Sequence, residues 1–401
     1  MDNKHMPVRP LDGITVVSLE HAIAAPFCSR QLADLGARVI KIERPAVGDF
    51  ARAYDTRTNG LASHFVWANR SKESLALDVK KPGGDAVLEA LLSKADVLIQ
   101  NLAPGAAARM GLSFQTLHER YPQLIVCDIS GYGAGGPYEH KKAYDLLIQS
   151  EGGFLSVTGG AGEDELAKAG CSIADISAGM YAYSGILSAL LLRGKTGQGS
   201  HVEVSMLESL VEWMGYPLYY AYEGAPPPPR AGAAHSTIYP YGPFPASEGD
   251  VVMLGLQNER EWALFCNCVL EQQHLLEDER FSSNAQRSTH RQALRKIIVE
   301  AFARLGTAEV IARLDAAPIA NAKVNDMQAV WRHPQLQARQ RWVQVGSPNG
   351  NLPALLPPAA NSAFTPRMDP IPGLGEHNET ILTELGYSDS DIDELKARGA
   401  I

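Results

Sequence analysis

Hydrophobic residues in the first half of the chain follow two alternating patterns. Short runs of β-branched and aliphatic residues, typical of buried strands, are separated by stretches with a helical period. Strands that alternate with helices of roughly 10–15 residues indicate parallel βαβ units, in which ligands bind beyond the carboxyl ends of the strands. The predicted strands are 14–18, 39–42, 74–78, 96–100, 124–130 and 201–205, and the predicted helices are 26–35, 82–95 and 173–192.

The pattern changes after residue 205. A helix is predicted over 206–222, and four consecutive prolines at 226–229 are the clearest linker in the chain. The sequence beyond them is mostly helical to about residue 320. We therefore predict a large domain that begins with 1–205, a linker at 206–229, a small domain at 230–325 and a return segment at 326–401 that completes the large domain.

Composition and charge narrow the class of protein. With 401 residues, 45% of them hydrophobic, and a net charge of −9, the chain is typical of folded globular proteins, and its acidic balance argues against nucleic-acid binding. The five cysteines form no C-x-x-C motif, so reduced thiols and a cytoplasmic location are expected. No signal segment precedes the first strand, and no apolar run approaches the roughly 18 residues that span a bilayer. We therefore expect no membrane partner.

Common nucleotide-binding and metal-binding motifs are missing from the sequence. The glycine-rich segment 131–136 follows a predicted strand, but it lacks the G-x-G-x-x-G spacing, so a turn-rich loop is the better interpretation. There is no Walker A motif, no G-x-S-x-G and no H-E-x-x-H, and the histidines show no metal-ligand spacing. We expect no metal ion and no tightly bound cofactor.

Asp175 lies at the start of the long predicted helix. The simplest interpretation is an acid at the N-cap or in the first turn, where the helix dipole favours negative charge. The functional interpretation is a carboxylate that stays ionised beside free backbone N–H groups, which could stabilise an oxyanion. The small residues Ala174, Ser177, Ala178 and Gly179 would leave room for a substrate.

A series of short motifs resembles the class III CoA-transferases, the group that contains formyl-CoA and carnitine CoA-transferases. Each motif is weak alone, but their order and spacing are specific, and the resemblance runs nearly end to end. The motifs are LDGI at 11–14, AAP at 24–26, LGARVIKIER at 35–44, NRSK at 69–72, NLAPG at 101–105, RMG at 109–111, GYG at 131–133, GP at 136–137, Asp175, TGQG at 196–199 and LGEH at 374–377.

The resemblance implies a covalent mechanism and a CoA path. In this family, an Asp at the position of Asp175 is the nucleophile, which passes through an aspartyl anhydride and an aspartyl-CoA thioester. CoA thioesters are then substrates. The positions that match the family's CoA path are His21, Arg44, Asn69, Lys72, Asn101, Leu102, Arg109, Lys142 and Met206. Arg and Lys suit phosphate groups, although for Lys72 and Lys142 a plain surface charge is an equal alternative.

Two departures from the formyl-CoA transferases bear on the substrate. Ile23 stands where those enzymes carry Gln, and no glycine-rich loop precedes the predicted small domain. The segment around Arg230 and His235 is more similar to members that act on C4–C6 dicarboxylates, with succinyl-CoA as donor. Arg230 or His235 would then meet the distal carboxylate.

Three alternatives remain. The α-methylacyl-CoA racemases of the same superfamily use a His where this chain has Tyr144, and a Tyr with a pKa near 10 is a poor base at neutral pH. A CoA-binding protein without chemistry and an acyl-CoA hydrolase are the others. We favour the transferase.

The expected architecture is α/β, with a Rossmann-like large domain and a smaller, mainly helical α+β domain. The resemblance implies an interlocked homodimer in which 206–229 and 321–344 would be the natural connectors.

Overall fold

A computed structural model describes residues 8–247 and 249–401, and the chain divides into two compact units. The first unit comprises residues 1–153, 169–214 and 336–401, and the second comprises 154–168 and 215–335. Each unit is described by itself below.

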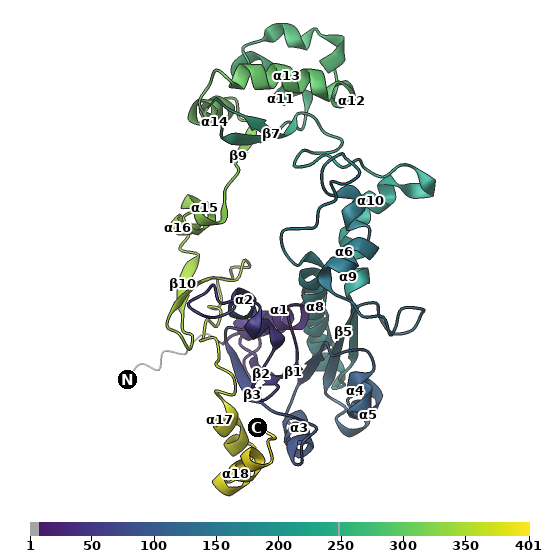
Figure 1. The fold of residues 1–401 in the computed structure, drawn as a ribbon, viewed down its shortest axis with the longest axis vertical. Helices are drawn as coiled ribbons and strands as arrows, with labels where there is room; N and C mark the ends of the chain where they lie inside the picture. The colour runs from purple at the N-terminus through teal and green to yellow at the C-terminus, as the bar shows by residue number, and fades with distance from the viewer. Residues whose placement is uncertain (1–7, 248) are drawn as a thin grey trace. The chain divides into compact units, whose positions relative to one another are not determined.

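The first unit is built on a six-stranded parallel sheet (Figure 1). Its order, β3-β2-β1-β4-β5-β6, reverses direction between β1 and β4, and this reversal places a crevice beyond the carboxyl ends of those two strands. The strands are β1 (Thr15–Leu19), β2 (Arg38–Glu43), β3 (Lys72–Ala76), β4 (Val97–Gln100), β5 (Ile125–Ser130) and β6 (His201–Ser205). The predicted α/β class and Rossmann-like sheet are confirmed.

Helices cover both faces of this sheet because its strands are apolar on both sides. On one face, Val17, Leu98 and Val126 pack against the helices α3, α5, α17 and α18. On the other face, α1 and α8 lie against each other and against the central strands. The helices of the first unit are α1 (Ala24–Asp34), α2 (Ser63–Ala68), α3 (Gly84–Leu92), α4 (Ala106–Arg109), α5 (Phe114–Arg120), α6 (Asp145–Glu151), α8 (Ile173–Thr196), α9 (Met206–Trp213), α17 (Asn378–Glu384) and α18 (Asp389–Ala397).

The C-terminal segment lies against the sheet of the first unit. Asn378 at the start of α17 accepts a hydrogen bond from the backbone N–H of Ala76 in β3, at 2.8 Å. The hairpin of β10 (Trp342–Val345) and β11 (Leu352–Leu355) packs with α2 in a small core of its own. α16 (Pro334–Ala338) lies at the boundary of the two units.

The second unit combines a three-stranded antiparallel sheet with helices. The sheet has the order β7-β8-β9, from β7 (Tyr241–Pro245), β8 (Val251–Gly255) and β9 (Ala320–Lys323). Its core is rich in aromatic residues, among them Phe244, Phe265 and Phe302. The helices are α7 (Phe154–Val157), α10 (Gly215–Tyr220), α11 (Glu259–Leu264), α12 (Asn284–Thr289), α13 (Arg291–Phe302), α14 (Thr307–Ala316) and α15 (Met327–Trp331).

Two predictions about helices need correction. The single helix predicted over 206–222 is two helices, α9 and α10, and the predicted linker 206–229 is therefore shared between the two units. The second concerns the prediction that no apolar run approaches the roughly 18 residues that span a bilayer. α8 has 24 residues, and an 18-residue window within it has a mean hydropathy of 1.2, so by length and composition alone it is able to cross a membrane. A core helix passes the same test, and α8 packs against α1 and α9 within the first unit.

Candidate functional site

The candidate site lies where the strand order reverses, between the ends of β1 and β4. Asn101, just after β4, binds both backbone polar groups of His21, just after β1. Its Oδ1 accepts the His21 N–H at 2.9 Å, and its Nδ2 donates to the His21 carbonyl at 2.9 Å. The structure therefore brings these two predicted residues together, with Asn101 fixing the backbone that carries the His21 ring.

The His21 ring presents an unsatisfied polar atom. The ring stacks on Phe50 with centroids 5.3 Å apart, and its Nδ1 is buried with no hydrogen-bond partner among the described residues. Burial, together with the nearby Lys41 and Arg44 charges, holds the pKa of His21 below its ordinary value, so the ring is neutral at pH 7.

The chain between β1 and α1 takes an unusual path. Ala22 has a φ of +59°, in the left-handed region that non-glycine residues rarely adopt, and its N–H donates to Asp49 Oδ1 at 3.1 Å. The turn ends at Ile23, the buried N-cap of α1, which has no side-chain cap. The first N–H of α1, that of Ala24, lies close enough to the Asp175 carboxyl to lower its pKa. A second element, the N-terminus of α1, thus faces the predicted nucleophile.

Asp175 itself lies in the first turn of α8, as predicted, but another residue caps that helix. The side chain of the N-cap, Ser172, makes no capping bond. Asp145, the first residue of α6, instead accepts the N–H groups of Ala174 at 2.8 Å and of Asp175 at 3.4 Å. Gln149 donates to the second oxygen of Asp145 at 2.7 Å and so fixes its orientation.

The expectation that Asp175 simply stays ionised is wrong. Burial and the neighbouring Asp145 carboxylate raise the pKa of Asp175 to about 7, although the Ala24 N–H favours the charged form. The carboxyl is therefore poised near neutral pH. Tyr54 also lies nearby, and its pKa is raised by burial and by the charges of Asp49 and Asp175.

Three of the predicted basic residues are exposed and suit the phosphates of CoA. Arg44 follows β2, Arg109 ends α4, and Lys142 lies in the loop before α6. None of the three forms an ion pair within residues 8–247 and 249–401. Their charges are therefore available to an anionic ligand.

Asn69 and Lys72 are buried, and for Lys72 both interpretations, a phosphate ligand and a surface charge, need correction. Lys72 is neither a surface charge nor free to bind a phosphate, because its ammonium donates to Glu20 at 2.7 Å, to the Pro26 carbonyl at 3.0 Å and to Asn69 at 2.9 Å. Asn69 is fully buried and donates its amide to the Phe65 carbonyl. Lys72, held by Asn69, thus joins the end of β1 at Glu20 to the first turn of α1 at Pro26.

The remaining predicted residues of the first unit are apolar or aromatic. Leu102 lies beside Asn101, with its N–H bonded to Gln100, and Met206 is buried at the start of α9. Tyr144 is 67% exposed and precedes Asp145 at the N-terminus of α6.

Arg230 and His235 belong to the second unit, so their part in the site stays a prediction. Arg230 donates to the carbonyls of Gly160 and Gly162, at 2.9 and 2.6 Å. His235 Nδ1 accepts the backbone N–H groups of Thr237 and Ile238, at 3.2 and 3.1 Å. The ring proton must therefore lie on Nε2, which remains a donor.

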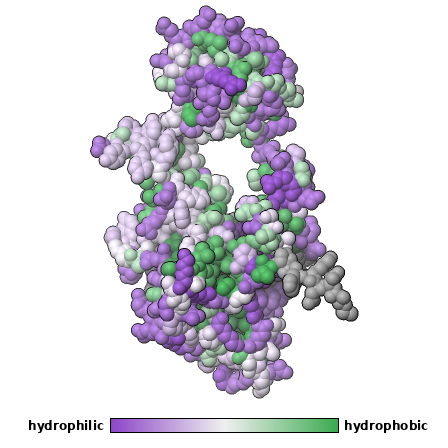
Figure 2. Space-filling model, turned by 180° about the vertical axis from the view of Figure 1, so that it is seen from behind, coloured by the Kyte–Doolittle hydropathy of each residue, from purple (hydrophilic) through white to green (hydrophobic). Residues whose placement is uncertain are grey.

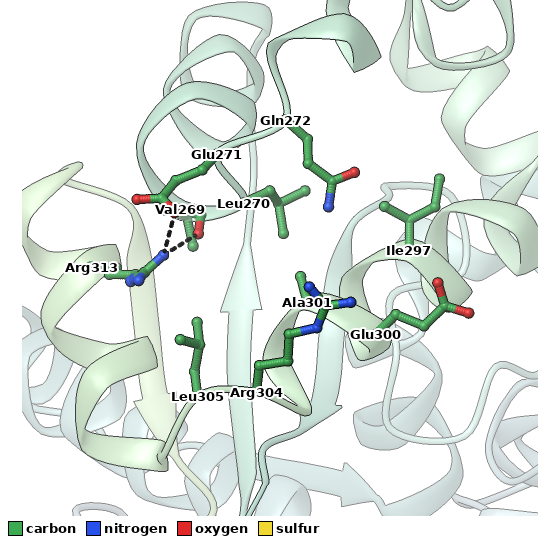
Figure 3. A pocket seen from close by; sticks show the side chains of 10 residues that line it. All are labelled: Val269, Leu270, Glu271, Gln272, Ile297, Glu300, Ala301, Arg304, Leu305 and Arg313. Atoms are coloured by element: carbon green, nitrogen blue, oxygen red, sulfur yellow. Dashed lines mark hydrogen bonds and ion pairs between the residues drawn. The ribbon is translucent and has the colours of Figure 1, made fainter.

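The second unit also contains a pocket of about 240 Å³ (Figure 3). Arg313 at its edge is already bonded to Glu271 and to the Val269 carbonyl, and Glu300 and Arg304 reach it from α13 and the turn that follows. Of the residues predicted for the site, none lines this pocket, and its mixed charges indicate no particular ligand.

Sequence reasoning missed Asp145, Ala24 and Asp49. Asp145 follows Tyr144 directly and opens a helix, which was a usable signal for a capping acid. Ala24 acts through its backbone, so its side chain carried no signal. Asp49 is the N-cap of a short 3₁₀ helix at 50–53, and only the fold shows that it also binds Ala22.

Comparisons with known proteins agree with this geometry. The family model for CoA-transferase family III matches residues 11–378. The succinyl-CoA:glutarate CoA-transferase of Homo sapiens is 31% identical over 398 residues, which cover 98% of this chain and 90% of the relative. The formyl-CoA:oxalate CoA-transferase of Shigella sonnei is 31% identical over 415 residues, with 98% and 99% covered.

Solved structures give the same result. A CAIB/BAIF family protein from Brucella suis superposes with a TM-score of 0.84 at 32% identity, covering 94% of this chain and 99% of that one. Because the family model spans most of the chain and relatives above 30% identity match it nearly end to end, the resemblance found in the sequence is confirmed. This chain belongs to CoA-transferase family III and is a class III CoA-transferase.

Proposed function

We propose that this enzyme moves CoA from succinyl-CoA to a C4–C6 dicarboxylate, with Asp175 as the covalent nucleophile. The observation that carries the proposal is the setting of the Asp175 carboxyl. It is partly buried in the first turn of α8, beside Asp145, which accepts the Asp175 N–H at 3.4 Å, and α1 packs against the next turn of α8 at Gly179. Its pKa is raised to about 7, mainly by burial and by Asp145. A carboxyl in this setting is placed to react with a thioester and is shielded from water.

The proposed reaction has four balanced steps. The Asp175 carboxylate attacks the carbonyl of the donor thioester, which gives a mixed anhydride and CoA thiolate. The thiolate attacks the aspartyl carbonyl, which releases the donor acid and leaves an aspartyl-CoA thioester. The acceptor carboxylate attacks the carbonyl of that thioester, which expels CoA thiolate and forms a second anhydride. The thiolate then attacks the acceptor's acyl carbonyl, which releases the new acyl-CoA and restores the Asp175 carboxylate.

The chain's own groups assist these steps electrostatically. The Ala24 N–H lies close enough to the Asp175 carboxyl to favour its charged form. It would stabilise the negative charge that develops on a carboxyl oxygen when the thiolate attacks the aspartyl carbonyl. Arg44, Arg109 and Lys142 would hold the phosphates of CoA.

The acceptor would be recognised by its distal carboxylate. The fixed tautomer of His235 leaves its Nε2–H free to donate, and Arg230 retains the donors of its second terminal nitrogen. Alanine at either position should raise the KM for the acceptor. An unchanged acceptor KM in both variants would remove these residues from the proposal.

We also propose a cytoplasmic homodimer. α8 is apolar along its length, yet only 33% of its apolar window is buried within the chain. Figure 2 shows apolar residues gathered on one face of the first unit. Large apolar side chains of α8 and α9 are exposed, namely Tyr181, Leu191, Leu192 and Trp213. A surface of this kind is typical of a subunit interface.

Mass spectrometry of the CoA esters tests the chemistry. Purified enzyme with succinyl-CoA is offered glutarate, itaconate, mesaconate, citramalate, oxalate and formate, with the Asp175→Asn variant as control. A new acyl-CoA that requires both the acceptor and Asp175 is the expected result. Deuterium exchange at the α-carbon of a branched acyl-CoA, without transfer, would favour the racemase instead. Loss of the thioester without an acceptor would indicate a hydrolase.

A further inference from the structure

A buried network of charges lies beneath the turn that leads from β1 to α1. At its centre, Glu20 is fully buried and accepts four hydrogen bonds from side chains. Ser18 and Ser29 donate to one carboxylate oxygen at 2.6 Å each, and Lys72 and Lys41 donate to the other at 2.7 and 3.3 Å. We call Glu20, Lys41, Asp49 and Lys72 the Glu20 network.

The network is charge-balanced and fully enclosed. It holds two carboxylates and two ammonium groups, and the side chains of Glu20, Lys41 and Lys72 have no exposed surface. Although burial alone would raise it, the pKa of Glu20 lies well below its usual range because Lys72 and Lys41 are adjacent. Enclosed charges of this kind are costly and are rarely optimal for stability alone.

The network holds both ends of the segment 20–24. Its first end is Glu20 itself, at the end of β1. At the other end, Lys72 donates to the carbonyl of Pro26 in the first turn of α1, at 3.0 Å, and Ser29 of α1 donates to Glu20. Between the ends, Lys41 fixes Asp49 at 2.8 Å, and Asp49 accepts the N–H of Ala22.

The network fixes the N-terminus of α1, where the Ala24 carbonyl lies so close to α8 that a Cβ on Gly179, one turn beyond Asp175, would come within 2.7 Å of it. Ala22 is in the left-handed region, at a cost that the surrounding contacts must offset. If the segment relaxed, the N-terminus of α1 would turn and the Ala24 N–H would leave the Asp175 carboxyl. We propose that Glu20 is a positioning residue for the transferase reaction, which holds the Ala24 N–H near Asp175 through the Glu20 network. This inference rests on the proposed role of Asp175 as nucleophile.

The chain offers a matched control at the other end of α1. Asp34 is also a buried carboxylate between two cations, with Arg70 donating at 2.8 and 2.7 Å and Arg30 at 3.3 Å. It ends the helix that Ala24 begins, about 15 Å away at 1.5 Å per residue. Asp34→Asn also removes one charge from a buried network. Burial raises the pKa of Asp34, whereas the adjacent lysines hold the pKa of Glu20 below its usual range, so Asp34→Asn should destabilise the protein less than Glu20→Gln does.

The experiment compares the two variants by kinetics and by thermal unfolding. In Glu20→Gln, we expect kcat to fall by about 10- to 100-fold while the KM for succinyl-CoA stays within about twofold. The acid limb of kcat/KM should move to higher pH, because Asp175 loses the N–H that favours its charged form, while Asp145 and Tyr54 still face it. In Asp34→Asn, Tm should fall by less, with kcat and the acid limb unchanged.

A double variant provides a second test if Glu20→Gln folds poorly. Glu20→Gln with Lys72→Met restores the charge balance, so Tm should recover while kcat stays low, because the bond from Lys72 to the Pro26 carbonyl is gone. If kcat recovers together with Tm, or if Glu20→Gln behaves like Asp34→Asn, the inference is wrong. Asp175→Asn, assayed in parallel, separates the two proposals, because activity in that variant would instead contradict the role of Asp175.

Discussion

The buried carboxyl of Asp175, which the proposed reaction requires, lowers the stability of the folded chain. Its pKa is about 7 in the folded chain because of burial and Asp145, whereas in an unfolded chain it would ionise near 3.8. Above pH 7 the folded protein must therefore hold a buried carboxylate that the unfolded chain exposes to water. Below about pH 4 the carboxyl is protonated in both states. The loss in the free energy of unfolding that Asp175 causes therefore grows as the pH rises from about 4 to about 7.

Asp175→Asn should therefore abolish CoA transfer and stabilise the protein. The gain in the free energy of unfolding should be absent near pH 4 and reach up to about 4 kcal/mol at pH 8, since each pKa unit is worth about 1.4 kcal/mol. Urea unfolding of both proteins at several pH values measures it. A gain that does not depend on pH would show that the pKa of Asp175 is not raised.

Asp145 should set part of the pH dependence of catalysis. In Asp145→Asn, the amide oxygen can still accept the Ala174 N–H, but the negative charge beside Asp175 is gone. The acid limb of kcat/KM should move from about pH 7 toward lower pH, without reaching 3.8, because burial is the larger cause of the shift. Asp96→Asn, at the opposite end of β4, is the control and should leave the limb in place.

The site depends on the close packing of α1 against α8. Gly179, one turn beyond Asp175, lies so close to α1 that a Cβ would come within 2.7 Å of the Ala24 carbonyl and 3.0 Å of Phe27. The absence of a side chain at Gly179 thus allows the N-terminus of α1 to approach Asp175.

Gly179→Ala should separate the two helices. We expect a loss of roughly 1–3 kcal/mol in the free energy of unfolding and a drop in kcat, because the Ala24 N–H moves with α1. Gly194 is the control in the same helix, since a Cβ there meets nothing within 4 Å. Gly194→Ala should stabilise the helix by about 0.5–1 kcal/mol and leave kcat unchanged. Equal kcat in the two variants would contradict this account.

The elements themselves could largely be predicted from hydrophobic patterning. β6 was placed correctly at 201–205 and β5 within one residue, because buried parallel strands are continuous apolar runs. The break between α9 and α10 was missed, since Gly215 and Pro217 interrupt an otherwise apolar stretch only weakly. The burial of Lys72 could not be predicted, because its partner Glu20 lies 52 residues away and only the pairing of β1, β2 and β3 brings them together.

At the scale of the whole molecule, the exposed apolar face of α8 requires an explanation. Leu191 and Leu192 are 72% and 52% exposed, at the end of a helix whose first turn carries Asp175. Leaving such residues in water is unfavourable by about 25 cal/mol for each Å² of apolar surface. A second copy of the chain that covers this face would remove the cost and would also couple assembly to the helix of the nucleophile.

The native protein should therefore have twice the 43.3 kDa mass of one chain in solution. Leu191→Glu should weaken the dimer, because it places a charge in an apolar interface, and light scattering over a dilution series would show the monomer at higher concentration than for wild type. Lys296→Glu, an equally exposed position in the second unit, should leave the mass unchanged. A monomeric wild-type protein with full transferase activity would show that α8 needs no partner, and the exposed leucines would then require another ligand.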